Sequence, residues 1–296
     1  NLKSTKHLNP ELFIAPNQLK SNCWFNTLFV SLFFSDKGRK FFRFFRNLMI
    51  TGKKYDNSKI TNEKLRKLFF ALNLYIEASY NKNSELFKKI NILTNGLQTN
   101  YFIKEIYNTI NSNSNSNSNS NSNSNINNNL YNINQPGNPI IYYKSIMEYL
   151  NYNVLKIMNI NIYNNINIKE YIQNKIANSK EIKDIIIIED LESQSKYDAN
   201  YEFNYKNEKY KYILDSIIIT NKDHFNPKKT SHFVSLLTIN KEPYKFDGSS
   251  KSKLEKFDWK KLLNKNMDWK FIEYDYYEPL KYNLTKGYKI LLYYRI

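Results

Sequence analysis

The chain contains one cysteine, Cys23, among its 296 residues. A single thiol cannot form an intrachain disulfide, and a zinc site built on cysteine ligands would lack its partners. We therefore expect a reducing compartment, such as a host cytoplasm, or a virion if the chain is viral. No metal or organic cofactor is implied.

Long apolar runs are also missing from the sequence. No stretch is long enough to span a bilayer, so we expect no membrane partner. Residues 1–20 lack the charged-then-apolar order of a signal peptide. The first residue is Asn rather than Met, which predicts that the chain has been trimmed or processed.

Glycine and proline are scarce, with 6 and 7 residues, whereas Asn, Ile, Lys and Tyr are heavily used. This bias is typical of AT-rich genomes, such as those of large DNA viruses and some protozoa. The formal net charge of +17 allows a nucleic acid, an anionic membrane or an acidic protein as partner. Because no Arg-rich run or RNA-binding signature accompanies the charge, nucleic acid is not the favoured partner.

Apolar residues recur at helical spacing through most of the first hundred residues. Directly after Cys23 they mark a helix that runs to about Phe34, and Ser21 and Asn22 can cap its start. The other segments with a helical pattern are 37–50, 61–80, 84–93 and 99–110. The sequence thus predicts a helical lobe over residues 1–110.

A low-complexity tract separates this lobe from the rest. Residues 111–125 alternate strictly between Asn and Ser, a composition that cannot bury apolar surface. We expect residues 111–137 to form a disordered linker or loop insertion, followed by a second lobe over residues 138–296.

The second lobe is rich in Ile, Val, Tyr and Phe, which favours strands. The predicted strands are 185–188, 212–220, 232–239, 243–247 and 288–294, and the predicted short helices are 142–151, 168–178 and 257–264. A helical lobe followed by a lobe with an antiparallel sheet is an α+β fold. We expect an active-site cleft between the two lobes.

Cys23 lies where the first helix is predicted to begin. The positive end of the helix dipole favours a thiolate, which is the nucleophilic form of cysteine. The alternative is a buried cysteine that acts as a small hydrophobe. Since Asn22 precedes Cys23 and Trp24 and Phe25 follow it, the thiol lies at a boundary between polar and apolar residues, which favours catalysis.

A nucleophilic thiol needs a base, and the chain has three histidines. His7 lies in an irregular lead-in, and His224 lies in a polar loop. His232 opens an apolar strand, which holds a base more rigidly, so His232 is the predicted general base. A hairpin after this strand would bring Asp247 beside His232 to orient its ring, although Asp247-Gly248 can also be a simple turn.

An oxyanion stabiliser is also expected. The backbone N–H of Cys23 is one predicted donor, and a side-chain amide shortly upstream is the other. Gln18 is the favoured amide, and Asn17 and Asn22 are the alternatives.

Four stretches of the chain, in order, resemble the ubiquitin-specific protease family of deubiquitinases, in a minimal viral or protozoan form. The residues 22–28 (NCWFNTL) are similar to the family's Cys box, and 184–191 resemble an apolar strand that precedes the His region. Residues 212–247 are similar to the His box, with an aromatic residue after the histidine and an aromatic-x-Phe-Asp end. Residues 287–295 look like the family's closing strand.

The resemblance implies a papain-like cysteine protease with a thumb of helices and a palm of sheet, which hydrolyses the bond after a ubiquitin C-terminal glycine. Carried over by position, Cys23 is the nucleophile, His232 the base, Asp247 the third member and Gln18 the residue in the oxyanion slot. The family places Asn in that slot. Its zinc-binding fingers need four cysteines, so the fingers are expected to be reduced or absent.

Other interpretations remain open at this stage. The order Cys, His, Asp excludes enzymes similar to SUMO proteases and adenoviral proteases, while the ovarian-tumour family shares the order Cys then His. On the same catalytic frame, the substrate can be ubiquitin, a ubiquitin-like protein, or a viral or self polyprotein. A catalytically inactive, basic binding module is the alternative from another functional class.

Overall fold

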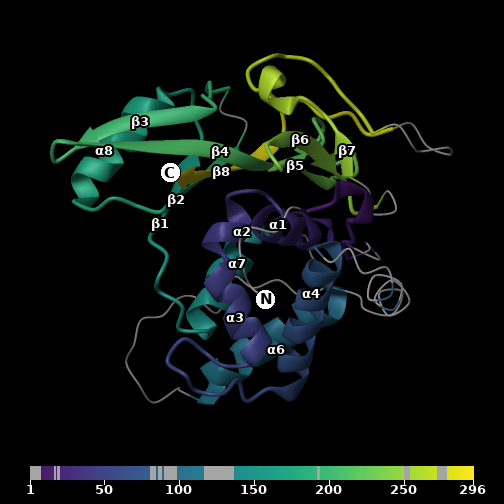
Figure 1. Ribbon diagram of the computed structural model, residues 1–296. Coiled ribbons are helices and arrows are strands. Elements are labelled where there is room, and N and C mark those ends of the chain that lie inside the picture. The colour runs from purple at the N-terminus through teal and green to yellow at the C-terminus, as the bar shows by residue number, and fades with distance from the viewer. Residues whose placement is uncertain are drawn as a thin grey trace.

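In the computed structural model, the described residues are 8–16, 18, 21–80, 85, 89, 99–116, 137–191, 194–249, 254–271 and 279–296. Most of the helices gather on one side of the molecule and a sheet forms a layer on the other (Figure 1). The helical elements are η1 (Pro10–Leu12), α1 (Cys23–Phe33), α2 (Gly38–Phe41), α3 (Arg43–Thr51), α4 (Glu63–Tyr80), α6 (Thr99–Ser116), α7 (Pro139–Tyr149), α8 (Ile168–Ser179) and η3 (Trp259–Leu262).

The strands are β1 (Ile157–Ile162), β2 (Ile185–Leu191), β3 (Asn200–Tyr205), β4 (Glu208–Thr220), β5 (Phe233–Ile239), β6 (Glu242–Phe246), β7 (Leu254–Lys256) and β8 (Tyr288–Arg295). They form one sheet in the order β1-β2-β8-β4-β5-β6-β7, with β3 paired to β4. Only β1 and β2 pair in parallel among these strands. The structure therefore confirms a mixed fold of helices and a mostly antiparallel sheet.

Each face of the sheet has its own core. One face packs on α1 and the helices around it, and the other packs on α8 and on residues of 259–271 and 280–284. Residues of β8 alternate between the faces, because successive side chains of a strand point to opposite sides. Ile290 joins the core on the α1 side, for example, and Leu291 joins the other core.

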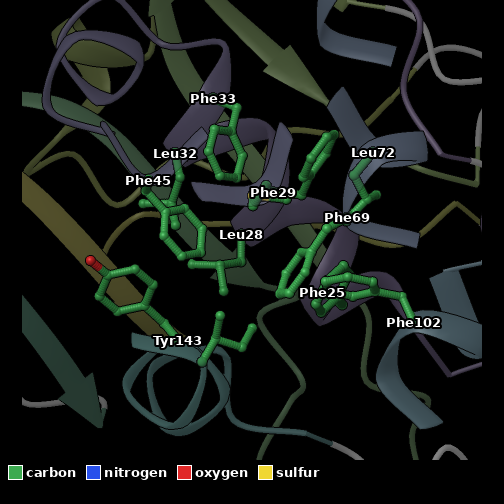
Figure 2. A pocket seen from close by; sticks show the side chains of 12 residues that line it. Phe25, Leu28, Phe29, Leu32, Phe33, Phe45, Phe69, Leu72, Phe102 and Tyr143 are labelled. Carbon is green, nitrogen blue, oxygen red and sulfur yellow. The ribbon is translucent and has the colours of Figure 1, made fainter. Parts of the chain in front are cut away.

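Helix α1 is buried along its whole length, and its residues are apolar except for Asn26, Thr27 and Ser31, whose side chains are hydrogen bonded. Figure 2 shows the core on its helical side, where apolar side chains surround a small cavity of about 30 Å³. The lining residues come from five helices: Phe25, Leu28, Phe29, Leu32, Phe33, Phe45, Met49, Phe69, Leu72, Phe102, Tyr143 and Ile146. These contacts, together with the sheet on its other side, fix the position of α1.

Two boundaries differ from those expected from the sequence. Helix α6 continues to Ser116, so the first six residues of the Asn-Ser tract prolong an existing helix instead of starting a linker. Helix α7 packs against α1 and α6, although residues 138–296 were expected to belong to the sheet lobe. The remainder of the tract and most of the helix predicted over 84–93 lie outside the described residues.

Asp215 links the sheet to the helices. It lies at a bulge in β4, and its carboxylate accepts hydrogen bonds from the backbone N–H groups of Lys37 (2.7 Å) and Gly38 (3.3 Å) at the start of α2. Burial raises the pKa of Asp215 to about 6. Hydrogen bonds from Ser35, Lys37 and Gly38 lower this pKa, but the effect of burial is larger. The folded state therefore prefers the protonated carboxyl.

This preference predicts a pH-dependent loss of stability. The folded chain binds more protons at Asp215 than the unfolded chain, whose pKa is near 3.8, so stability falls as pH rises from about 4 to 6. The loss is about 3 kcal/mol from a shift of about two units. We expect Asp215→Asn to lack this pH-dependent loss. The free energy of unfolding of the variant minus that of wild type, measured by urea unfolding, should therefore be larger at pH 7 than at pH 4. An equal difference at both pH values would contradict the assignment.

Candidate active site

Cys23 is the first residue of α1 and is buried, with 7% of its surface exposed. Its backbone N–H belongs to the first turn, where the donors have no acceptor within the helix. Helix α1 packs against β5, and Ser235 of β5 ties the two together by donating from Oγ to the Thr27 carbonyl (3.0 Å). The strand that begins directly after His232 therefore holds the helix that begins at Cys23.

His232 and Asp247 lie at the same end of a β-hairpin. Strands β5 and β6 pair from Ser235–Phe246 to Ile239–Glu242, with the turn at Asn240 and Lys241, which both adopt positive φ. His232 precedes β5 and Asp247 follows β6, so the pairing places them side by side. The distance from His232 Nε2 to Asp247 Oδ1 is 2.7 Å.

Asp247 is fully buried and further hydrogen bonded. Its Oδ1 also accepts from the backbone N–H and the Oγ–H of Ser249, both at 2.8 Å. These bonds hold the carboxylate in one orientation against His232 Nε2. Since Asp247 occupies Nε2, Nδ1 is the ring nitrogen left for the thiol of Cys23.

The electrostatics of His232 follow from this arrangement. Burial by itself lowers the pKa of His232, but hydrogen bonds to Asp247 and Cys23, together with the charges of both groups, raise it to about 10. An imidazole with such a pKa stays protonated at neutral pH. The site therefore favours an imidazolium flanked by a carboxylate and by the sulfur of Cys23.

Gln18 lies beside this group. Its backbone N–H donates to the carbonyl of Gly248 (3.2 Å), next to Asp247. A Cβ at Gly248 would lie 3.8 Å from Gln18 Cβ and 3.4 Å from Asn26 Nδ2 in the first turns of α1. Gln18 Oε1 is buried without a hydrogen-bond partner in the described part of the chain.

The other residues considered from the sequence are placed differently. His224 lies in the β4–β5 loop, where its Nδ1 is 2.5 Å from Ser231 Oγ. The side chain of Asn22 makes no cap hydrogen bond to α1, and its Nδ2 donates to Thr99 Oγ1 (2.5 Å). His7 and Asn17 lie outside the described residues.

A buried network behind Cys23 was not predicted. Thr99 donates to Asn26 Oδ1 (2.8 Å), and Asn26 Nδ2 donates to the Pro16 carbonyl (3.1 Å). The network joins α6, α1 and the segment that carries Gln18. Asn221 was missed as well: its Oδ1 accepts from the His232 backbone N–H at 2.9 Å. Asparagine is so common in this chain that neither position stands out in the sequence.

Two further properties concern the described residues. No group of three or more His, Cys, Asp or Glu side chains among them is arranged to hold a metal ion. None of the helices in the described ranges is long and apolar enough to cross a membrane.

No protein-family model and no curated protein matches the sequence. Among solved structures, the chain is similar to one in the SAGA DUB module with Ubp8 bound to monoubiquitin, with a TM-score of 0.51 and 9% identity over 97% of this chain and 70% of that chain. The module bound to ubiquitin aldehyde matches with a TM-score of 0.46 and 9% identity, over 97% and 70% of the two chains. A yeast SAGA DUB module matches with a TM-score of 0.46 and 10% identity, over 97% of this chain and 69% of that chain. The first likeness shows a fold like that of the ubiquitin-specific proteases.

Proposed function

We propose that the protein is a cysteine peptidase of the deubiquitinase type, which hydrolyses an isopeptide or peptide bond. The observation that carries this proposal is the geometry around His232. Its Nε2 is bonded to the buried Asp247 at 2.7 Å, and its pKa is raised by Asp247 and by Cys23 at the start of α1. A nucleophilic thiol, a base, and an acid that is hydrogen bonded to the base are the groups that acyl transfer needs.

The proposed mechanism has two steps. The Cys23 thiolate attacks the scissile carbonyl, the C–N bond breaks, and the His232 imidazolium gives its proton to the leaving amine. His232 then takes a proton from water as the resulting hydroxide attacks the thioester, the C–S bond breaks, and the carboxylic acid leaves and loses its proton to solvent, which regenerates the Cys23 thiolate and the His232 imidazolium. Asp247 keeps Nδ1 directed at the sulfur, in the role that the acid of a catalytic triad performs.

The oxyanion formed in each step needs hydrogen-bond donors. The backbone N–H of Cys23 has no acceptor within α1, so it is available to the substrate oxygen. Gln18 is the proposed second donor, because it lies next to Gly248 and Asn26, near the first turns of the same helix.

Ubiquitin is the proposed substrate class. Its support is the likeness in fold to a deubiquitinase module that was solved with monoubiquitin, together with the order of Cys23, His232 and Asp247 along the chain. The thumb and palm arrangement, and fingers that are reduced or absent, form part of this proposal.

A ubiquitin probe with a C-terminal thiol-reactive warhead tests the proposal. We expect wild type to form a covalent adduct and Cys23→Ala to form none, with the adduct mapped to Cys23 by mass spectrometry. If a small thiol reagent modifies Cys23 rapidly but the probe does not, the chain is a thiol peptidase with another substrate, such as a polyprotein. If Cys23 is inert to both reagents, the binding-module interpretation replaces the enzyme.

A further inference from the structure

Asn221 ends the ladder between β4 and β5 in an unusual way. In a hydrogen-bonded pair of an antiparallel ladder, the two residues exchange both N–H···O=C bonds. Asn221 N–H donates to the His232 carbonyl (3.2 Å), as this pattern requires. The return bond from His232 N–H, however, goes to the side-chain Oδ1 of Asn221 (2.9 Å).

The side chain thus replaces the residue's own carbonyl. The Asn221 carbonyl instead accepts from the backbone N–H of His224 (3.0 Å), which starts the turn of the β4–β5 loop. The second half of the amide is used too, because Nδ2 donates to the Thr230 carbonyl (3.0 Å). The Asn221 side chain therefore holds both the backbone that leaves β4 and the backbone that returns to His232.

Burial makes these bonds costly to lose. Asn221 is 1% exposed and His232 is 7% exposed, so water has little access to replace a missing partner. The neighbouring strand β8 closes the other side. Gly287 has φ +73°, and a Cβ there would lie 2.9 Å from the Asn221 carbonyl oxygen, so only a glycine lets β8 pass this close.

We propose that Asn221 is a positioning residue for His232, which sets the backbone from which the imidazole reaches Asp247 and Cys23. The inference rests on the proposed function for its consequence in catalysis. A base must be held to within a fraction of an ångström by the groups around it. Asn221 supplies this constraint at the backbone, whereas Asp247 supplies it at the ring.

Substitution of Asn221 by Ala and by Asp separates the two halves of its side chain. Asn221→Ala removes both bonds, whereas Asn221→Asp keeps an acceptor for His232 N–H and loses the donor to Thr230. We expect Asn221→Ala to lower kcat about 10- to 100-fold with KM nearly unchanged, since small displacements of a catalytic group have effects of this size. Asn221→Asp should retain more activity than Asn221→Ala.

Asn264→Ala is the matched control. Asn264 also makes one accepting and one donating side-chain bond to backbone, both to Tyr197 (2.9 and 2.8 Å), and Tyr197 belongs to the core on the other face of the sheet. We expect this variant to lose thermal stability without a change in kcat. The same kcat for Asn221→Ala as for Asn264→Ala would overturn the proposal.

Two readouts separate this inference from the proposed function. The imidazole signals of His232 in proton–nitrogen NMR, followed with pH, should shift in Asn221→Ala and stay unchanged in Asn264→Ala. The rate at which iodoacetamide modifies Cys23 should fall in the first variant alone. Both tests work even if wild type does not react with ubiquitin, and unchanged His232 signals and Cys23 rates in folded Asn221→Ala and Asn221→Asp would refute the positioning role.

Discussion

Replacement of His232 by Ala is expected to lower kcat/KM for a ubiquitin substrate by about 10⁴-fold or more, as loss of the base does in other triads. The reason is that His232 is bonded to Asp247 at 2.7 Å and its pKa is raised by Asp247 and by Cys23, and in the proposed mechanism this one ring acts as both base and acid. Steady-state hydrolysis of a fluorogenic ubiquitin substrate measures the effect. The rate of Cys23 alkylation should fall in parallel.

His224→Ala is the natural control for this experiment. His224 lies in the loop before His232, where its Nδ1 contacts Ser231 Oγ, whereas His232 is the histidine whose ring is bonded to Asp247. We expect its replacement to change kcat/KM less than tenfold. Similar losses in the two variants would contradict the assignment of His232 as the base.

Loss of the His232 ring also removes one hydrogen-bonding partner of the buried Asp247, whose bonds from Ser249 remain. Removal of one member of a buried charge pair is strongly destabilising, so His232→Ala can lose activity by partial unfolding. His232→Gln addresses this, because its amide N–H can still donate to the carboxylate while it cannot transfer protons. We expect His232→Gln to be the more stable variant in thermal unfolding and equally inactive.

The candidate site could be predicted from the sequence because its residue types are rare. One cysteine and three histidines leave few combinations, and the periodicity after Cys23 together with the apolar run after His232 predicts a helix and a strand. The structure brings Asp247 to His232 through the β5–β6 hairpin, with its turn at Asn240 and Lys241. The catalytic roles of these residues stay a prediction.

Parts of the sheet could not be predicted, for local reasons. Strand β1 (IMNINI) alternates Ile and Asn, and in so Asn-rich a chain this alternation was not distinctive. Strand β3 joins β4 through Lys206 and Asn207, which both have positive φ. Hairpins of this kind usually carry Gly in the turn, so the usual signal was missing.

The supporting residues of the site were hidden by composition. Asn26, Thr99 and Asn221 act through bonds to backbone or to residues far along the chain, such as the bond from Thr99 to Asn26. Such bonds depend on tertiary contacts and leave no periodic pattern. The nucleophile and the base could be inferred from chemistry and spacing, whereas the groups that orient them required the fold.

Replacement of Asp247 by Asn is expected to lower kcat about 10²- to 10⁴-fold, because an amide holds the ring poorly and cannot stabilise the imidazolium. Its effect on pH dependence is the sharper test. In wild type His232 has a pKa of about 10, so we expect activity to persist through neutral pH and to fall only as pH rises toward 10. Without the carboxylate, the pKa of His232 drops. The alkaline limb of the pH–activity profile, where activity falls as pH rises, should therefore move to lower pH by about one unit or more.

Ser249→Ala distinguishes the charge of Asp247 from its orientation. It removes the Ser249 Oγ–H bond to Asp247 Oδ1 (2.8 Å) but leaves the carboxylate charge and the backbone N–H bond in place. We expect kcat to fall less than tenfold and the alkaline limb to stay where it is. An alkaline limb that is equally unmoved in Asp247→Asn would show that Asp247 does not set the protonation of His232, and the acid of the triad would then have to be sought elsewhere.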